Sequence, residues 1–141
     1  MRTEILYEDK SIMVVRKPAG LAVQSAGIGQ PDVVSELKSH LAKLPDAGRP
    51  GKGEPYLGIV HRLDQPVEGV LVFAKTKKAA AGLSKQVTDG TMKKTYQAVC
   101  CVTEKGRRWL ENAEEWHALT DYLVKDARTN TSSVTEKGRK E

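Results

Sequence analysis

The stretch that decides the fold reads Tyr56-Leu-Gly-Ile-Val-His-Arg-Leu-Asp-Gln-Pro-Val-Glu-Gly-Val-Leu-Val-Phe-Ala-Lys-Thr76. Its two ends, residues 56–60 and 70–74, are short apolar runs that predict β-strands. Between them lies a polar segment in which Pro66 and Gly69 favour a turn over a continuous strand. We therefore expect strand, loop and strand, with the ionisable side chains on the loop.

The flanking sequence predicts an α+β domain. The expected strands are 4–8, 12–16, 56–60, 70–74 and 94–102, and the expected helices are 32–43, 77–87 (capped by Thr76) and 108–119. Residues 44–55, rich in Pro and Gly, predict a long loop. From residue 126 onward the polar chain predicts no further strand or helix. Because the hairpins imply antiparallel pairing, we expect a mixed, mainly antiparallel sheet with flanking helices.

Length and composition limit the class of protein. A chain of 141 residues can bury a real core, and we expect residues 1–141 to form a single domain. No apolar run approaches the ~18 residues that span a bilayer, and no leader opens the chain. The adjacent Cys100 and Cys101 and three scattered histidines lack the spacing of zinc ligands. These features predict a reduced, cytoplasmic protein without a metal.

The positive charge is unevenly distributed. The net charge is +5, and residues 75–108 hold a cluster of basic side chains against only Asp89 and Glu104. The cluster comprises Lys75, Lys77, Lys78, Lys85, Lys93, Lys94, Lys105, Arg107 and Arg108. Such an imbalance suits a polyanion such as nucleic acid, and a solvated basic face is the alternative.

The loop at residues 61–69 is the one place where ionisable groups converge. It holds an imidazole (His61), a guanidinium (Arg62) and two carboxylates (Asp64 and Glu68). A carboxylate beside an arginine stays ionised well below neutral pH and is therefore available as a nucleophile or base. The alternative is an ordinary Arg–Asp network that only holds a turn together.

The segment 56–76 resembles the active-site signature of the RluA family of RNA pseudouridine synthases. Three further segments resemble that family in the same order along the chain. They are Ile5-Leu-Tyr-Glu-Asp9 with Val14-Val-Arg-Lys-Pro-Ala-Gly-Leu21, Lys94-Thr-Tyr-Gln-Ala-Val99, and Asp121-Tyr-Leu-Val-Lys-Asp126. The likeness runs from Glu4 to about Val134. It implies the pseudouridine synthase catalytic fold.

The resemblance implies roles for three residues. Asp64 would be the catalytic aspartate, which attacks or deprotonates the target uridine nucleotide so that the base detaches, rotates and rejoins through carbon. Arg62 would fill the place of the flipped base or hold the nucleotide phosphate. Tyr96 would lie against the flipped uracil, although by pattern alone it fits the core of a strand. The reaction implied needs neither a metal nor a cofactor.

Four other residues are candidates for RNA contacts. His61 would position the loop rather than act as a general base. Lys17 and Lys94 would meet phosphate or else be ordinary surface lysines. Lys75 belongs to the basic stretch, which would face RNA and add affinity without sequence information.

Two departures from the family pattern stand out. Val67 and Glu68 replace a usual Thr-Ser pair, so the loop loses hydroxyls and gains negative charge near Asp64. The second departure is that nothing after Asp126 matches the family's later basic motif. We therefore expect a catalytic domain truncated at its carboxyl end, with no separate S4-like domain. A partner segment or chain would complete the sheet by covering its exposed edge or apolar face.

The sequence thus predicts an enzyme that converts specific uridines to pseudouridine in structured ribosomal or transfer RNA. One alternative is a non-catalytic RNA-binding fragment of such a synthase. Another is a protein-interaction domain with an incidental basic patch.

Overall fold

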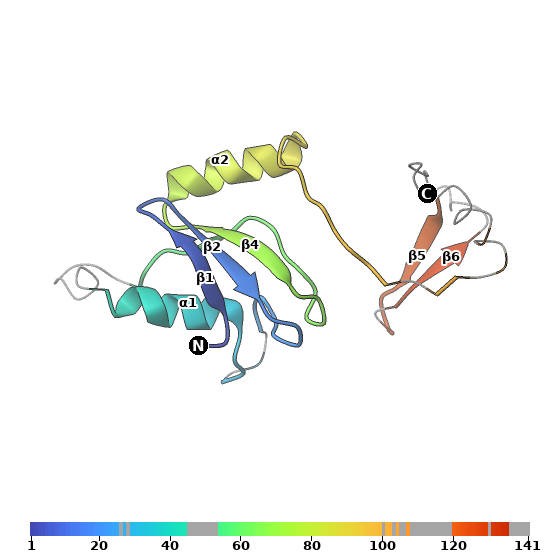
Figure 1. Cartoon of the computed structure of the whole chain (residues 1–141), viewed down its shortest axis with the longest axis horizontal. Helices are drawn as coiled ribbons and strands as arrows, with labels where there is room; N and C mark the ends of the chain where they lie inside the picture. The colour runs from blue at the N-terminus through green and yellow to red at the C-terminus, as the bar shows by residue number, and fades with distance from the viewer. Residues whose placement is uncertain are drawn as a thin grey trace. The chain divides into compact units, whose positions relative to one another are not determined.

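The computed structural model describes residues 1–25, 27, 29–44, 54–99, 101, 102, 104, 107, 120–129 and 131–135. The chain divides into two compact units, Met1–Thr95 and Tyr96–Glu141, which we describe separately (Figure 1). The expectation that residues 1–141 form a single catalytic domain stays a prediction. No helix within the described ranges is long and apolar enough to cross a membrane.

The first unit is built on a four-stranded antiparallel sheet with two helices. Its elements are β1 (Glu4–Glu8), β2 (Ile12–Lys17), α1 (Val33–Ala42), β3 (Gly58–Ile59), β4 (Gly69–Ala74) and α2 (Lys77–Thr88). The strand order is β1-β2-β4-β3, and each neighbouring pair is antiparallel. The predicted α+β class, with a mainly antiparallel sheet and flanking helices, is confirmed.

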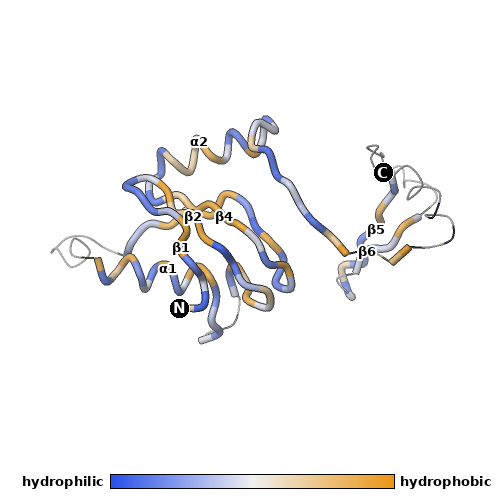
Figure 2. Tube along the Cα trace, in the orientation of Figure 1, coloured by the Kyte–Doolittle hydropathy of each residue, from blue (hydrophilic) through white to orange (hydrophobic). Residues whose placement is uncertain are grey.

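One face of the sheet makes the hydrophobic core with α1. The register pairs Met13 with Phe73 and Val15 with Leu71, so these four buried side chains share a face. On α1 the buried residues Val33, Val34, Leu37 and Leu41 keep helical spacing and belong to the same core cluster. Figure 1 shows α1 and α2 on opposite sides of the sheet, and Figure 2 shows hydrophobic residues along β2 and β4.

Side-chain caps set the beginnings of both helices. Asp32 accepts hydrogen bonds from the Ser35 amide (2.7 Å) and from the Ser25 amide (2.7 Å), so it also fastens the preceding loop. Thr76 Oγ1 accepts a hydrogen bond from the Ala79 amide (3.1 Å), as the sequence predicted. α2 packs against β3 and β4. A Cβ at Gly58 would lie 3.1 Å from that of Ala80, so glycine permits this close approach.

Three predictions about secondary structure need correction. The strand expected at 56–60 is reduced to Gly58–Ile59. The strand expected at 94–102 does not form in the residues described there, which are exposed and lack a partner strand within the described chain. A closing element does exist, because β5 (Tyr122–Asp126) pairs antiparallel with β6 (Thr131–Thr135). The helix expected at 108–119 and the loop at 45–53 lie outside the described residues.

The missed hairpin has a local cause. Asp126 Oδ1 accepts a hydrogen bond from the Arg128 amide (2.8 Å) and so closes the turn. The β6 sequence, Thr-Ser-Ser-Val-Thr, is polar but rich in β-branched residues, which tolerate an exposed strand. Polarity alone was therefore a poor guide to this segment.

Candidate active-site loop

The loop after β3 presents alternate side chains to the protein and to solvent. His61 and Leu63 are partly buried, whereas Arg62 and Asp64 are exposed. Leu63 packs against the core, and a Cβ at position 69 would lie 2.9 Å from Leu63 Cδ1, which explains the glycine there. Arg62 and Asp64 therefore project outward from an anchored segment.

His61 anchors the start of the loop through its imidazole. The pairing of β3 with β4 ends at Ile59, which lies opposite Phe73. The Val72 amide of β4 then donates a hydrogen bond to the His61 side chain, at 3.2 Å from Nε2. Burial lowers the pKa of His61, and the nearby charge of Lys94 lowers it further. Because Nε2 accepts this hydrogen bond, the ring is neutral and carries its proton on Nδ1. This geometry fits a positioning role.

Lys17 anchors the loop at Gln65 through its buried ammonium group. Its side chain is fully buried, and its Nζ donates to the carbonyls of Pro18 (3.1 Å), Leu21 (2.7 Å) and Gln65 (3.0 Å). Burial lowers the pKa of Lys17, while the charges of Asp64 and Glu68 act in the opposite direction. The surface-lysine alternative is therefore wrong, and all three donors of Nζ are occupied by carbonyls rather than free for phosphate.

Gln65 joins the loop to the turn that follows β2. Its carbonyl also accepts a hydrogen bond from the Gly20 amide (2.8 Å), and its Nε2 donates to the Gly20 carbonyl (3.2 Å). Gly20 has φ +79°, a left-handed conformation that favours glycine. Sequence reasoning missed Gln65 because its role lies mostly in the main chain, although the glycine after Lys17-Pro18 signalled a special turn.

The carboxylate of Asp64 has no side-chain or main-chain partner within the described residues. Among the described residues, no hydrogen bond or ion pair engages its side chain, and none joins it to Arg62. The alternative of an Arg–Asp network that holds the turn is therefore wrong. Glu68 instead lies 4.0 Å from Arg16, which also pairs with Glu4 at 2.6 Å. The loop thus exposes a guanidinium and a carboxylate, two residues apart, that have no side-chain partner in the part of the chain that the structure describes.

The remaining predicted RNA contacts divide into engaged and free residues. Lys75 Nζ binds Glu8 (2.6 Å) and the Asp9 carbonyl (2.7 Å), so it fastens β4 to the β1–β2 turn. Lys94 is exposed. Tyr96 is 63% exposed and lies outside any described strand, so the strand-core reading of this residue is wrong. It belongs to the second unit, and its role at Asp64 stays a prediction.

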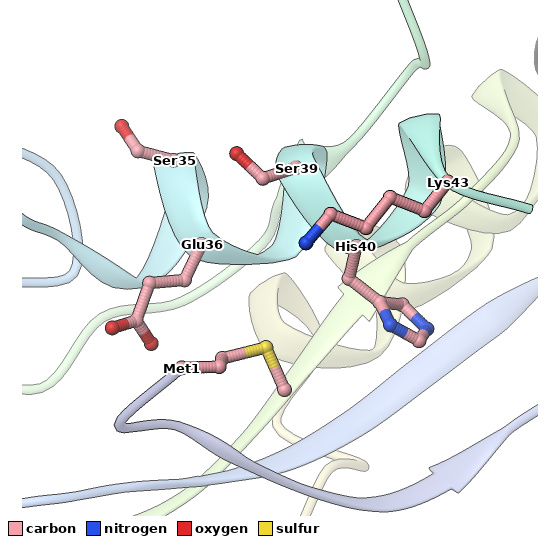
Figure 3. Close-up of a pocket in the computed structure, with 6 residues that line it drawn as sticks. All are labelled: Met1, Ser35, Glu36, Ser39, His40 and Lys43. Carbon is pink, nitrogen blue, oxygen red and sulfur yellow. The ribbon is translucent and has the colours of Figure 1, made fainter.

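Potential ligand-holding features are few in the part of the chain that the structure describes. No group of three or more His, Cys, Asp or Glu side chains there could hold a metal ion. One cavity of about 420 Å³ runs along α1, where Glu36 and His40 project toward the N-terminal segment (Figure 3). Both groups are already engaged, Glu36 with the Arg2 and Thr3 amides and His40 with Glu8. A second cavity adjoins Gln65.

Comparison with known proteins identifies the family. A family model described as RNA pseudouridylate synthase matches residues 11–141. Ribosomal large subunit pseudouridine synthase D of Zymomonas mobilis is 43% identical over 98 residues, covering 68% of this chain and 30% of its own length. The protein of that name from Xylella fastidiosa is 39% identical over 137 residues, covering 94% of this chain and 38% of its own length.

A solved structure, human RNA pseudouridylate synthase domain containing 4, is 33% identical with a TM-score of 0.47, covering 62% of this chain and 30% of that chain. The chain thus spans about a third of the length of the curated relatives described above. Because the family model extends over nearly the whole sequence, this chain belongs to the RNA pseudouridylate synthase family, as its resemblance to the RluA synthases predicted.

Proposed function

We propose that this chain isomerises uridine to pseudouridine in structured RNA, with Asp64 as the catalytic residue. The observation that carries the proposal is the exposed, uncommitted carboxylate of Asp64 on a loop that His61 and Lys17 anchor from two sides. A reacting carboxylate must be free of other partners yet held in place, since misplacement by even 1 Å can cost about 100-fold in rate.

The proposed reaction conserves every atom of the nucleotide. Asp64 attacks or deprotonates the uridine nucleotide, the bond from N1 to the ribose breaks, and the base rotates. A bond from C5 to the same ribose carbon then forms, which releases Asp64 if it attacked the ribose, or follows the return of the proton that Asp64 removed. C5 then loses its proton and N1 gains one. Arg62 shares the exposed side of the loop and fills the place of the flipped base or holds phosphate. Tyr96 lies against the uracil ring. No cofactor takes part.

The basic stretch supplies the proposed RNA-facing surface. Exposed lysines follow one another over α2 and the segment after it: Lys77, Lys78, Lys85, Lys93 and Lys94. Such a surface attracts phosphate without reading sequence and makes binding sensitive to salt. Lys17 and Lys75 are left out of it because their ammonium groups are engaged within the fold.

Of the two RNA classes that the sequence suggested, we favour ribosomal RNA, since the relatives' names refer to the large ribosomal subunit. Transfer RNA is the second candidate. We place the reaction in the cytoplasm, in keeping with the free, exposed thiol of Cys101. We also propose that a further segment or chain completes the sheet, because β3 pairs with only two residues of β4 and Val70 is 57% exposed.

The test is pseudouridine formation in ribosomal and transfer RNA by the 141-residue chain and by Asp64→Asn. Product from the unaltered chain alone supports the proposal. Asp89→Asn is the matched control, since its amide oxygen can still accept from the Thr91 amide in the turn after α2. Salt-dependent RNA binding without product from any variant would favour the non-catalytic RNA-binding alternative. Equal product from the unaltered chain and from Asp64→Asn would refute the role of Asp64.

A further inference from the structure

A second cavity, of about 480 Å³, opens directly beside the Asp64 loop. It is lined by Gln65, the residue after Asp64, by the turn at Gly20–Ala22, and by Arg2, Gln24, Ser25, Gln30 and Pro31. The volume falls within the usual range of pockets for small molecules. A Cβ at Gly20 would meet nothing within 4 Å, so the turn leaves open space in front of it.

The walls of this cavity are held in place by hydrogen bonds before any ligand arrives. Gln65 is tied to Gly20 in both directions, as described above. The Ala22 carbonyl accepts from the Val33 amide at 3.0 Å. The Arg2 amide donates to both carboxylate oxygens of Glu36, at 2.9 and 3.0 Å. A preformed site loses less conformational entropy on binding than a mobile one.

Three polar groups at the cavity have no partner among the described residues: the Gln24 amide, Gln65 Oε1 and the Arg2 guanidinium. A glutamine side chain offers a donor and an acceptor in one plane, which matches the edge of a nucleobase. The carboxylates behind the walls, Asp32 and Glu36, disfavour a phosphate as the principal bound group.

We propose that this cavity binds the base of the nucleotide next to the target uridine in the RNA. The proposal rests on the proposed function, because the two nucleotides are covalently linked and the first must lie at Asp64. Gln24 and Gln65 contact the base edge, and the guanidinium of Arg2 stacks on the base. The site thereby contributes to the choice of uridine.

The test uses side-chain and backbone amide signals of the full 141-residue chain, labelled with ¹⁵N, in titrations with the four nucleoside 5′-monophosphates. We expect saturable shifts of the Gln24 and Ala22 signals with at least one of them, and none with ribose 5-phosphate. Gln24→Ala should weaken that binding about tenfold, whereas Gln86→Ala, a glutamine exposed on α2, should leave it unchanged.

Two outcomes would overturn the proposal. Equal shifts with ribose 5-phosphate would mean that the cavity recognises phosphate rather than a base. Absence of shifts at Gln24 and Ala22 with every nucleotide would mean that it binds none. Either result leaves the Asp64→Asn comparison intact, so pseudouridine formation by the unaltered chain would separate failure of this site from failure of the proposed function.

Discussion

Replacing Lys17 by methionine tests whether the buried ammonium holds the candidate active-site loop. The substitution keeps most of the side-chain volume but removes three hydrogen bonds to carbonyls. The Gln65 carbonyl would still accept from the Gly20 amide, whereas those of Pro18 and Leu21 would lose their donor. The buried Leu21 carbonyl without a donor costs about 1–3 kcal/mol and the part-buried Pro18 carbonyl costs less, so the two together cost about 2–5 kcal/mol.

Methionine also avoids the cost of burying a charge, which offsets part of that loss. We therefore expect Lys17→Met to lower the free energy of unfolding by about 3 kcal/mol, a large share of the ~5–15 kcal/mol of an ordinary domain. Urea denaturation followed by far-ultraviolet circular dichroism measures the change. Lys10→Met, at an exposed position in the β1–β2 turn, is the control and should change stability by less than about 0.5 kcal/mol. A loss below about 1 kcal/mol in Lys17→Met would refute this account of the loop.

Four further substitutions address the loop, α2 and the cap of α1. Gly69→Ala should displace the Leu63 side chain and lower the free energy of unfolding by about 1–2 kcal/mol. Gly82→Ala, which adds a Cβ in open space on α2, should raise the free energy of unfolding by about 0.5–1 kcal/mol. Urea denaturation measures both changes. The pKa of His61 is lowered in the folded chain. Between that lowered pKa and the unfolded value of ~6.5, the unfolded chain takes up a proton that the folded chain does not. The free energy of unfolding should therefore fall as the pH drops below ~6.5. His61→Gln, which keeps an acceptor for the Val72 amide, should remove this component, and an unchanged pH profile would contradict it. Burial alone would raise the pKa of Asp32, but the hydrogen bonds from the Ser25 and Ser35 amides outweigh it, so the pKa is lowered. The contribution of Asp32 to the free energy of unfolding is therefore complete above pH ~3.9 and is lost in stronger acid. Asp32→Asn should flatten the acid side of the curve of stability against pH.

The parts of the fold that local sequence predicts are those with local causes. Apolar spacing predicts the helix at 32–43 and the cap Thr76 predicts the helix at 77–87, whereas the capping role of Asp32 comes from the structure. The hairpin of β1 and β2 followed from a polar turn between apolar runs, and Asp9 closes it by accepting from the Ser11 and Ile12 amides. The described residues among 94–102 do not form a strand, because alternation describes a strand only when a neighbour supplies hydrogen bonds. No local pattern reports whether that neighbour exists.

The candidate site divides in the same way. The sequence identified the loop and its ionisable residues, Arg62 and Asp64 among them, but left open whether these two pair with each other. It could not predict the burial of Lys17, because a lone lysine is expected at the surface. The partners that make its burial tolerable include the carbonyl of Gln65, 48 residues away in the chain. Such a contact is a product of the fold and leaves no trace in local pattern.

Glu68 shows how the fold changes the meaning of a departure from a family motif. In the sequence it is a second carboxylate, four residues from Asp64, that adds negative charge near it. In the structure Arg16 lies 4.0 Å from Glu68 and also pairs with Glu4, so the charge of Glu68 is partly offset on the sheet. Asp64 has no such partner among the described residues. The two carboxylates of the loop therefore differ in their neighbours, and this difference adds to the motif in support of the proposal that Asp64 is the reacting group.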